Sequence, residues 1–403
     1  MTKDFRKAGR IFNKFLKLTL GSYMRLFLGY KIINRQIMGL RPPFIVIANH
    51  TNFYDPFLLS MCIPDPVHFV ASDAYFRSRI LRFLLKLVGA IPKVKFISDP
   101  RSIKNILSVV KSKGVIGIFA EGRRNWDGLT LPLVRPTAKL AKSLKIPVVS
   151  VLFKGACLTM PRWARGTRRG ELTMTCSLVL SRDDVSERSV DEIYDAMTES
   201  LAHDEYEWQR SRMIPYKGRR KAERLELFIF RCPECGSDNH MKSRDDRFFC
   251  EKCNYTVTYD EYGFFKPVSD KLYFDNPRDW NLWQLDSLEK ALYKDGSPGP
   301  EAPRLEDTGV TGYVGGREGS LAKQTSAGVL QLYRDRLVFR YGENVRSFAV
   351  KDISGENIQF NYAFEFRCKN SVYRFTGGSG VISAYKWAKA LEILKAKDMP
   401  VHE

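Results

Sequence analysis

Short apolar runs rich in β-branched residues recur through the first half of the chain, and segments of helical periodicity separate them. Such runs predict buried strands, and they cover residues 44–48, 67–71, 115–119 and 146–153. Helices are predicted at 102–113 and at about 134–144, with a longer helical stretch at 184–213. Strands that alternate with helices predict an α/β fold, layered around a central and mostly parallel sheet, over residues 41–215. The alternating segment 171–181 is expected to form an edge strand of this sheet.

Two stretches near the start of the chain combine an apolar helical face with basic residues. Residues 1–41 carry ten Lys or Arg against one acidic residue, Asp4. Within residues 76–95, one helical stripe is formed by Ile80, Phe83, Leu84, Leu87 and Val88. Basic amphipathic helices are typical of membrane interfaces, where anionic lipid attracts Lys and Arg. We therefore expect residues 1–40 to form membrane-associating helices, although an ordinary helix packed on the domain would show the same pattern.

The charge of the chain agrees with a membrane partner but does not require one. The 403 residues carry a formal net charge of +20 at pH 7, which suits a membrane surface, a phosphorylated substrate or a nucleic acid. The sequence has no run of 18 uncharged apolar residues and no secretory signal, so no conventional transmembrane helix is expected. Four of the eight cysteines form two Cys-x-x-Cys pairs, which favours a reducing compartment. We expect a peripheral or monotopic protein on the cytoplasmic side of a membrane.

A histidine and an aspartate follow the first predicted strand. The run 44–48 stops at His50, and Asp55 stands five residues later, directly before Pro56 and a predicted helix. In α/β sheets, chemistry is found at the carboxyl ends of strands. A histidine there can serve as a general base, and a neighbouring carboxylate can fix its tautomer and stabilise its protonated form. The alternative is that Asp55 only caps the helix and that His50 is an ordinary polar residue.

A second predicted strand ends in the polar segment Glu121-Gly122-Arg123-Arg124. If the two strands are parallel members of one sheet, this segment lies at the same edge as His50. Gly122 would let the backbone approach a ligand closely, and Arg123 or Arg124 could bind a phosphate through two hydrogen bonds. A plain charged turn is the alternative.

Four ordered blocks of sequence resemble the motifs of the glycerolipid acyltransferases. They are Asn49–Asp55 with its His-x4-Asp spacing, Gly89–Lys95, Phe119–Arg124 and Ile146–Val151. On these blocks, residues 40 to about 155 resemble the 1-acyl-glycerol-3-phosphate (lysophosphatidic acid) acyltransferases. The chain departs from the usual family residues at Asn52, Lys95, Ala120, Arg123 and Ser150. These departures bear on the acceptor substrate more than on the reaction type.

The resemblance implies transfer of a fatty acyl group from a thioester, acyl-CoA or acyl-carrier protein, to the free hydroxyl of 1-acyl-glycerol-3-phosphate. The product would be phosphatidic acid. His50 and Asp55 would be catalytic, and the acceptor would be bound by Lys95, Glu121, Gly122, Arg123 and Arg124. The chain has no Gly-x-Ser-x-Gly elbow, which favours direct transfer over an acyl-serine intermediate. A thioester-directed lipid hydrolase is an alternative.

Two Cys-x-x-Cys pairs, separated by fourteen residues, predict a metal site in the second half of the chain. The four thiolates are Cys232, Cys235, Cys250 and Cys253. This spacing predicts a zinc ribbon over residues 228–262 whose Zn²⁺ is structural, because four protein ligands leave no open position. Iron is the alternative metal. Zinc ribbons also bind nucleic acids, so a nucleic-acid-binding protein is an alternative function, but no nucleic acid is expected because the basic excess lies mainly in the N-terminal half.

The rest of the chain predicts a small β-rich module. A helix at 278–293 and a Pro/Gly-rich linker are expected within residues 263–310. Short strands follow between residues 328 and 375, and a helix is expected at 380–395. Several strands followed by one helix predict an α+β module over 311–397, which resembles the pleckstrin-homology/GRAM superfold.

Overall fold

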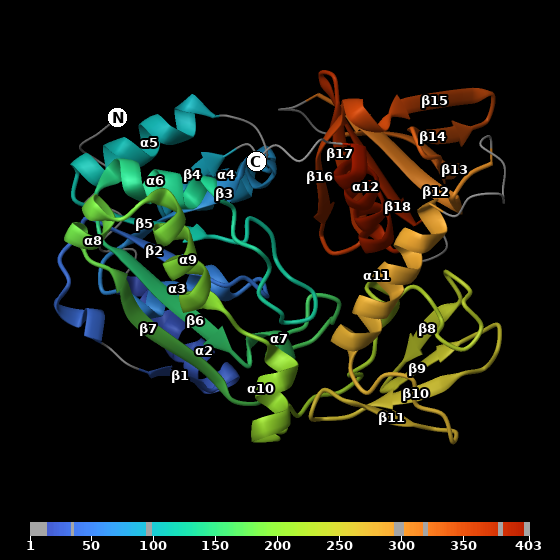
Figure 1. The fold of residues 1–403 in the computed structure, drawn as a ribbon, viewed down its shortest axis with the longest axis horizontal. Coiled ribbons are helices and arrows are strands. Elements are labelled where there is room, and N and C mark those ends of the chain that lie inside the picture. Colours follow the sequence, from blue (N-terminus) through green and yellow to red (C-terminus); the bar gives the residue numbers. More distant parts are fainter. Residues whose placement is uncertain are drawn as a thin grey trace. The chain divides into compact units, whose positions relative to one another are not determined.

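The computed structural model describes residues 14–33, 36–93, 99–293, 302–316, 321–377 and 382–398. The chain divides into two compact units. The first consists of Met1–Arg162, Gly166–Arg219 and Glu261–Gly263, and the second of Trp163–Arg165, Arg220–Asp260 and Phe264–Glu403 (Figure 1).

The first unit is built on a seven-stranded sheet with the order β1-β7-β6-β2-β5-β3-β4. Its strands are β1 Tyr30–Ile33, β2 Phe44–Ala48, β3 Val67–Ser72, β4 Ile91–Lys93, β5 Val115–Phe119, β6 Val148–Lys154 and β7 Leu172–Leu180. Within this sheet every neighbouring pair of strands is parallel except β6 and β7. The prediction of a central, mostly parallel sheet is therefore confirmed.

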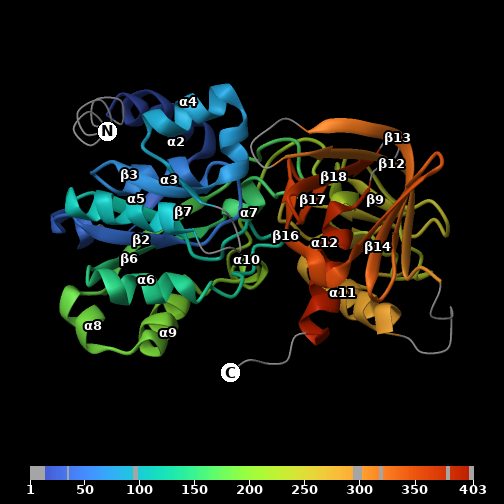
Figure 2. The same ribbon diagram turned by 90° about the horizontal axis from the view of Figure 1, so that it is seen from above.

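Helices cover both faces of the central strand β2. Phe44 and Val46 face a core that includes residues of α2 and α3, whereas Ile45 and Ile47 face a core that includes residues of α5, α6 and α9. These helices are α2 Ser22–Leu28, α3 Asp55–Cys62, α5 Pro100–Lys111, α6 Pro136–Leu144 and α9 Val190–Leu201. Figure 2 shows α2 and α3 on one side of the sheet and α6 and α9 on the other. Because β2 is covered on both faces, its sequence is a continuous apolar run.

The remaining helices of the first unit are short. They are α4 Arg79–Leu87, α7 Ala156–Thr159, α8 Arg182–Glu187 and α10 Glu205–Arg212. The helical stretch predicted at 184–213 is thus three helices, α8, α9 and α10. Ser181 and Ser189 start two of them with capping boxes, in which each serine accepts a main-chain hydrogen bond three residues ahead.

The prediction of an edge strand at residues 171–181 is wrong. β7 lies between β6 and β1, and Tyr30 of β1 pairs with Leu172 in parallel register. Leu172, Met174 and Cys176 are buried against the core. Alternating apolar and polar residues along a strand therefore indicate only that one face of the strand is covered. They do not distinguish an edge strand from an inner one.

The prediction of helices through residue 40 is wrong for Tyr30–Ile33, which form the strand β1. Helix α2 ends at Gly29, which adopts a left-handed conformation with φ of 66° and donates its N–H to the carbonyl of Arg25. The strand β1 follows at once, and its aromatic and β-branched residues suit a pleated surface. Residues 1–13 of the predicted segment lie outside the described residues.

The second unit contains a four-stranded antiparallel sheet with the order β11-β10-β9-β8. Its strands are β8 Met241–Arg244, β9 Arg247–Cys250, β10 Thr256–Tyr259 and β11 Phe265–Pro267. The sheet therefore continues past residue 262, the predicted end of the ribbon. The helix α11, Pro277–Tyr293, places Trp280 against the rings of Phe248 and Phe265, with ring centroids 5.5 Å apart in each pair. Phe248 and Trp280 are completely buried, so these aromatic residues form a core.

The C-terminal module is a seven-stranded antiparallel sheet followed by the helix α12, Ala384–Asp398. Its strands are β12 Leu305–Gly315, β13 Ala322–Leu332, β14 Arg336–Tyr341, β15 Asn344–Ala349, β16 Ile353–Gln359, β17 Ala363–Cys368 and β18 Ser371–Gly377. The strand β12 begins before residue 311 and lies partly in the predicted linker. Its register shifts and its Gly309, with φ of 67°, interrupt the alternation by which a strand is recognised in sequence.

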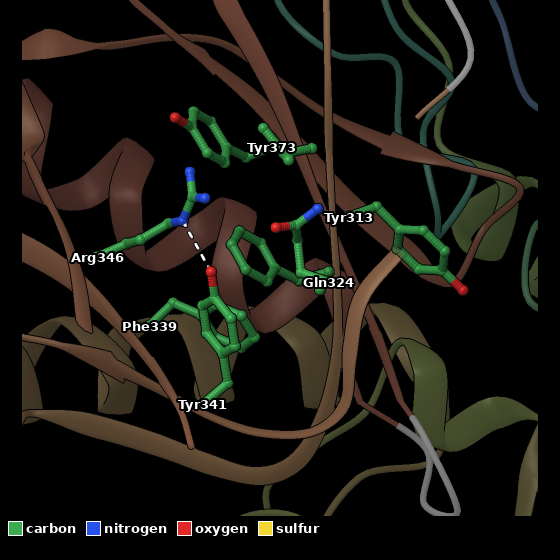
Figure 3. A pocket seen from close by; sticks show the side chains of 9 residues that line it. Tyr313, Gln324, Phe339, Tyr341, Arg346 and Tyr373 are labelled. Atoms are coloured by element: carbon green, nitrogen blue, oxygen red, sulfur yellow. Dashed lines mark hydrogen bonds between the residues drawn. The ribbon is translucent and has the colours of Figure 1, made fainter. Parts of the chain in front are cut away.

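A small hollow in this module is lined mainly by aromatic side chains (Figure 3). Arg346 donates Nε–H to the hydroxyl of Tyr341 at 3.1 Å, and its guanidinium lies 5.9 Å from the ring of Tyr373. The rings of Phe339 and Phe375 pack with centroids 4.9 Å apart. The hollow is therefore a continuation of the aromatic core of the module.

Candidate active site and metal site

His50 and Asp55 are joined directly by a hydrogen bond. His50 lies just beyond the carboxyl end of β2, and Asp55 is the first residue of α3. Nδ1 of His50 lies 2.8 Å from Oδ2 of Asp55, whose side chain is completely buried. The same oxygen accepts the main-chain N–H groups of Thr51 and Asn52, at 2.6 and 2.9 Å. Asp55 thus holds the turn and orients the imidazole at the same time, so the two roles weighed from the sequence are not exclusive.

Two buried asparagines connect the His50 turn to the strand β6 and to the first residue of α7. The amide of Asn49 exchanges two hydrogen bonds with the main chain of Phe153, at 2.8 and 3.0 Å. Asn52 donates to the carbonyl of Ala156 at 3.0 Å. On another side of the imidazole, the ring of Phe119 stacks with its centroid 4.0 Å away. These contacts restrict the position of His50, and sequence reasoning did not identify the asparagines as part of the site.

The carboxylate of Glu121 binds the main chain of the His50 turn. Oε1 accepts the N–H of His50 at 2.5 Å, and Oε2 accepts the N–H of Leu131 at 2.9 Å. The side chain is buried, and this burial raises the pKa of Glu121 to about 8, against the lowering effect of its hydrogen-bond donors. The N–H of Asn125 in turn donates to the carbonyl of His50 at 2.8 Å. The loops that follow β2 and β5 are therefore hydrogen-bonded to each other, as expected for adjacent parallel strands.

The other residues of this loop differ in exposure and conformation. Gly122 has φ of 68°, a conformation that glycine adopts without strain. Arg123 is exposed and Arg124 is half-buried. The carbonyl of Arg124 accepts a hydrogen bond from Nη1 of Arg162 at 2.6 Å. Lys95, predicted as a further acceptor-binding residue, lies outside the described residues.

This geometry brings the imidazole of His50, the carboxylate of Asp55 and a loop that bears two arginines to one edge of the sheet. The carboxylate of Asp55 can keep the imidazole of His50 in one tautomer. Arg124 directly precedes Asn125, whose main-chain N–H donates a hydrogen bond to the carbonyl of His50. An imidazole base and arginine side chains on a hydrogen-bonded loop are suited to proton abstraction beside a bound anion.

The four paired cysteines form one cluster. Their sulfur atoms all lie within 4.8 Å of one another, with 3.6 Å between Cys232 and Cys253 and 3.8 Å between Cys235 and Cys250. Zn–S bonds of about 2.3 Å in a tetrahedron place sulfur atoms about 3.8 Å apart, so the donor set and its spacing fit zinc. Four sulfur ligands would close the coordination shell, which assigns a bound Zn²⁺ a structural role.

The two cysteine pairs share one backbone conformation. Gly236 donates its N–H to the carbonyl of Cys232, and Asn254 donates to that of Cys250. Gly236 and Asn254 both have positive φ, 66° and 63°. Glycine and asparagine are the residues that adopt this conformation most readily, so their place four residues after the first cysteine of each pair supports the ribbon independently of the cysteines.

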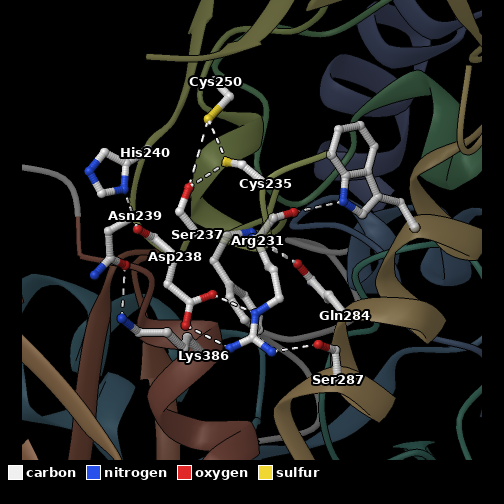
Figure 4. Close-up of polar contacts among 12 residues, drawn as sticks. Arg231, Cys235, Ser237, Asp238, Asn239, His240, Cys250, Gln284, Ser287 and Lys386 are labelled. Atoms are coloured by element: carbon white, nitrogen blue, oxygen red, sulfur yellow. Dashed lines mark hydrogen bonds and ion pairs between the residues drawn. The ribbon is translucent and has the colours of Figure 1, made fainter. Parts of the chain in front are cut away.

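Hydrogen bonds connect the metal-site segment to α11 and α12 (Figure 4). Arg231 binds both carboxylate oxygens of Asp238, at 2.7 and 2.8 Å, and donates to Ser287 of α11 at 2.6 Å. Asn239 accepts from Lys386 of α12 at 2.8 Å. The ribbon and the terminal helix are therefore parts of one hydrogen-bonded unit.

Comparison with known families agrees with this site. Residues 30–154 match the family model described as Acyltransferase, and residues 222–259 match the model described as Ribosomal protein S27a. The first match contains β2, β5, β6 and all four sequence blocks. Residues 30–154 are therefore similar to the acyltransferase family.

Two curated proteins that the chain resembles carry the name of a glycerolipid enzyme. The chain is 25% identical over 189 residues to the 1-acyl-sn-glycerol-3-phosphate acyltransferase of Bacillus subtilis, covering 47% of this chain and 92% of that protein. It is 28% identical over 163 residues to the enzyme of the same name from Saccharomyces cerevisiae, covering 39% of this chain and 51% of that protein. The crystal structure of a 1-acyl-sn-glycerophosphate acyltransferase from Thermotoga maritima aligns with a TM-score of 0.43 and 17% identity, over 50% of this chain and 81% of that chain.

No helix in the described part of the chain has both the length and the apolar character needed to cross a bilayer.

Proposed function

We propose that the protein transfers a fatty acyl group from an acyl thioester to the free hydroxyl of 1-acyl-glycerol-3-phosphate, giving phosphatidic acid. The observation that carries this proposal is the His50–Asp55 pair at the end of β2, hydrogen-bonded to the loop that bears Arg123 and Arg124. The names of the Bacillus and Saccharomyces relatives support the same acceptor.

Proton transfer through His50 would activate the acceptor. With Asp55 accepting Nδ1–H, Nε2 of the imidazole serves as the base that takes the proton of the glycerol hydroxyl. The hydroxyl oxygen forms a bond to the thioester carbonyl carbon. The tetrahedral intermediate then breaks its C–S bond, and the thiolate takes the proton from the imidazolium. Asp55 stabilises the imidazolium, and holding the two substrates in line can lower the barrier by ~7–11 kcal/mol.

The arginines would bind the acceptor through its phosphate. Arg123 and Arg124 supply planar, permanently charged donors that match a phosphate group, and Gly122 lets the main chain come close to it. Lys95 is proposed as a further contact to the phosphate. Glu121 has both carboxylate oxygens bound to main-chain N–H groups, so we assign it to holding the loop rather than to binding the acceptor.

One side of the first unit is suited to an anionic membrane surface. Large apolar side chains are exposed there on α2 and α4, including Leu26, Ile80 and Phe83 at 78, 74 and 67%. Figure 2 shows α2 and α4 on the same side of the sheet. Arg79 and Arg82 of α4 are also exposed. We propose that this side contacts the cytoplasmic face of a membrane, where the acceptor lipid is found.

Product identification tests this proposal. The purified protein is mixed with acyl-CoA and with vesicles that contain one lysolipid at a time, and the products are measured by mass spectrometry. Phosphatidic acid, formed from lysophosphatidic acid in preference to the other lysolipids, is the expected result. Free fatty acid as the main product would instead indicate a thioester hydrolase, and no acyl product from any lysolipid would overturn the proposal.

A further inference from the structure

Arg162 is a buried cation that none of the sequence motifs includes. It follows α7 and the proline at position 161, and only 7% of it is exposed. Its guanidinium lies over the ring of Trp126, 4.4 Å from the centroid, and Nη1 donates to the carbonyl of Arg124 at 2.6 Å. A buried guanidinium is stable only when its donors are used, and here one of them holds the main chain of the proposed phosphate-binding loop.

The loop is therefore held from two directions around Arg124. At the residue after Arg124, the N–H of Asn125 donates to the carbonyl of His50 at 2.8 Å. At Arg124 itself, the carbonyl accepts from Arg162. Trp126, on which Arg162 rests, is 5% exposed and so belongs to the core. These contacts determine the position of the Arg124 main chain relative to His50.

We propose that Arg162 is a positioning residue for the acceptor. It acts through Arg124, whose carbonyl it holds so that the Arg124 guanidinium meets the acceptor phosphate. This inference rests on the proposed function. A lysine would keep the charge at position 162, but it lacks the planar fork that stacks on Trp126 while donating to a carbonyl.

Steady-state kinetics of Arg162→Lys measures the effect. We expect the KM for lysophosphatidic acid to rise about tenfold to a hundredfold, the equivalent of one hydrogen bond made by a charged group. The kcat at saturating acceptor and the KM for acyl-CoA should change less than threefold. Arg165→Lys is the matched control, because Arg165 is exposed and lies three residues further along the chain. Its kinetic constants should equal those of the wild type.

A double-mutant cycle tests whether Arg162 acts through Arg124. In the Arg124→Ala background the guanidinium at position 124 is gone, so Arg162→Lys should cause no further rise in the KM for lysophosphatidic acid. Independent, multiplicative effects of the two substitutions would overturn the inference. So would an unchanged acceptor KM in Arg162→Lys alone.

Two measurements separate this inference from folding and from the proposed function. Circular dichroism and the melting temperature show whether Arg162→Lys is folded. If it is not, Trp126→Phe replaces it, because phenylalanine keeps an aromatic face under Arg162 and should still raise the acceptor KM above that of the wild type. A wild-type protein that forms phosphatidic acid, together with an unchanged acceptor KM in the folded variant, overturns the role of Arg162 and leaves the function standing. A wild type without acyl transfer overturns both.

Discussion

The main-chain N–H of His50 donates a 2.5 Å hydrogen bond to Oε1 of Glu121, across 71 residues of chain. The second carboxylate oxygen of Glu121 accepts the N–H of Leu131. A side chain that was expected to contact the acceptor is thus directed into the protein, where it joins two loops. The spatial relation between the base and the arginine loop depends on this buried carboxylate.

Replacing Glu121 by Gln should lower kcat and raise the acceptor KM, because Glu121 joins the His50 turn to the loop that bears Arg123 and Arg124. The amide can accept one main-chain N–H but presents a donor to the other, so one buried N–H loses its partner. We expect about a tenfold loss of kcat and a stability loss of ~1–3 kcal/mol. Kinetics and urea unfolding measure both, with exposed Glu187→Gln as the control. A rise in the acceptor KM at constant kcat would instead assign Glu121 to substrate binding.

The raised pKa of Glu121 also predicts a pH dependence of stability. Burial raises this pKa from 4.5 to about 8, so between these values the folded state binds a proton that the unfolded state has lost. Stability therefore falls as pH rises from 4.5 to 8, and it becomes independent of Glu121 above that range. Urea unfolding of the wild type and Glu121→Gln across this range should show the wild type losing stability relative to the variant. A constant difference between the two proteins would contradict the assignment.

Replacing Asp55 by Asn should remove activity while the turn remains. Asparagine can still accept the N–H groups of Thr51 and Asn52, but it no longer favours the tautomer with a basic Nε2. In enzymes with a Ser-His-Asp triad, the same change of the aspartate to asparagine lowers kcat by about four orders of magnitude. We expect a loss of at least about a thousandfold. Initial rates of phosphatidic acid formation give the result. Asp191→Asn, at an exposed position, is the matched control and should retain full activity. Wild-type rates in Asp55→Asn would show that Asp55 only starts the helix α3 and has no catalytic role.

The metal site predicts one zinc per chain and a metal-dependent second unit. Cys235→Ser removes one ligand, so bound zinc should be lost, and the unit should unfold more readily because metal binding is coupled to folding. Elemental analysis and hydrogen exchange over α11 and α12 measure these effects. Cys368→Ser, outside the cluster, should leave the zinc content unchanged. Wild-type protein purified without any metal would remove the ribbon assignment.

Membrane contact through α4 predicts that a charge at Phe83 weakens vesicle binding. The side chain is 67% exposed, so Phe83→Glu should leave the fold intact while it repels anionic lipid. Flotation with vesicles of phosphatidylcholine and phosphatidylserine should recover less of the variant. Leu178→Glu, an exposed position on β7, is the control and should float as the wild type does. Equal recovery of both variants would exclude α4 from the contact.

Local sequence patterns predicted those parts of the fold that depend on burial. β2, β5 and β6 are largely buried strands, and each appears in the sequence as a predominantly apolar run. Because β2 and β5 are parallel neighbours, the polar residues that follow them meet at one edge. The cysteine cluster was also predictable, because two Cys-x-x-Cys pairs at this spacing are typical of a four-thiolate metal site.

Contacts between distant segments were not predictable in this way. Glu121 was expected to contact substrate, because nothing near it in sequence indicates that the His50 main chain is its partner. Arg162 reaches Arg124 across 38 residues, and its own surroundings contain no recognisable motif. β1 was missed because four residues are too few to interrupt a basic helical pattern. Tertiary contacts determine all three features.

The most direct test of the central claim compares initial rates of phosphatidic acid formation by the wild type and by His50→Ala on the same vesicles. The account predicts that the wild type forms phosphatidic acid and that the variant, folded by circular dichroism, forms none above the uncatalysed rate. His240→Ala, at an exposed histidine, should equal the wild type. Wild-type rates in folded His50→Ala would contradict the account.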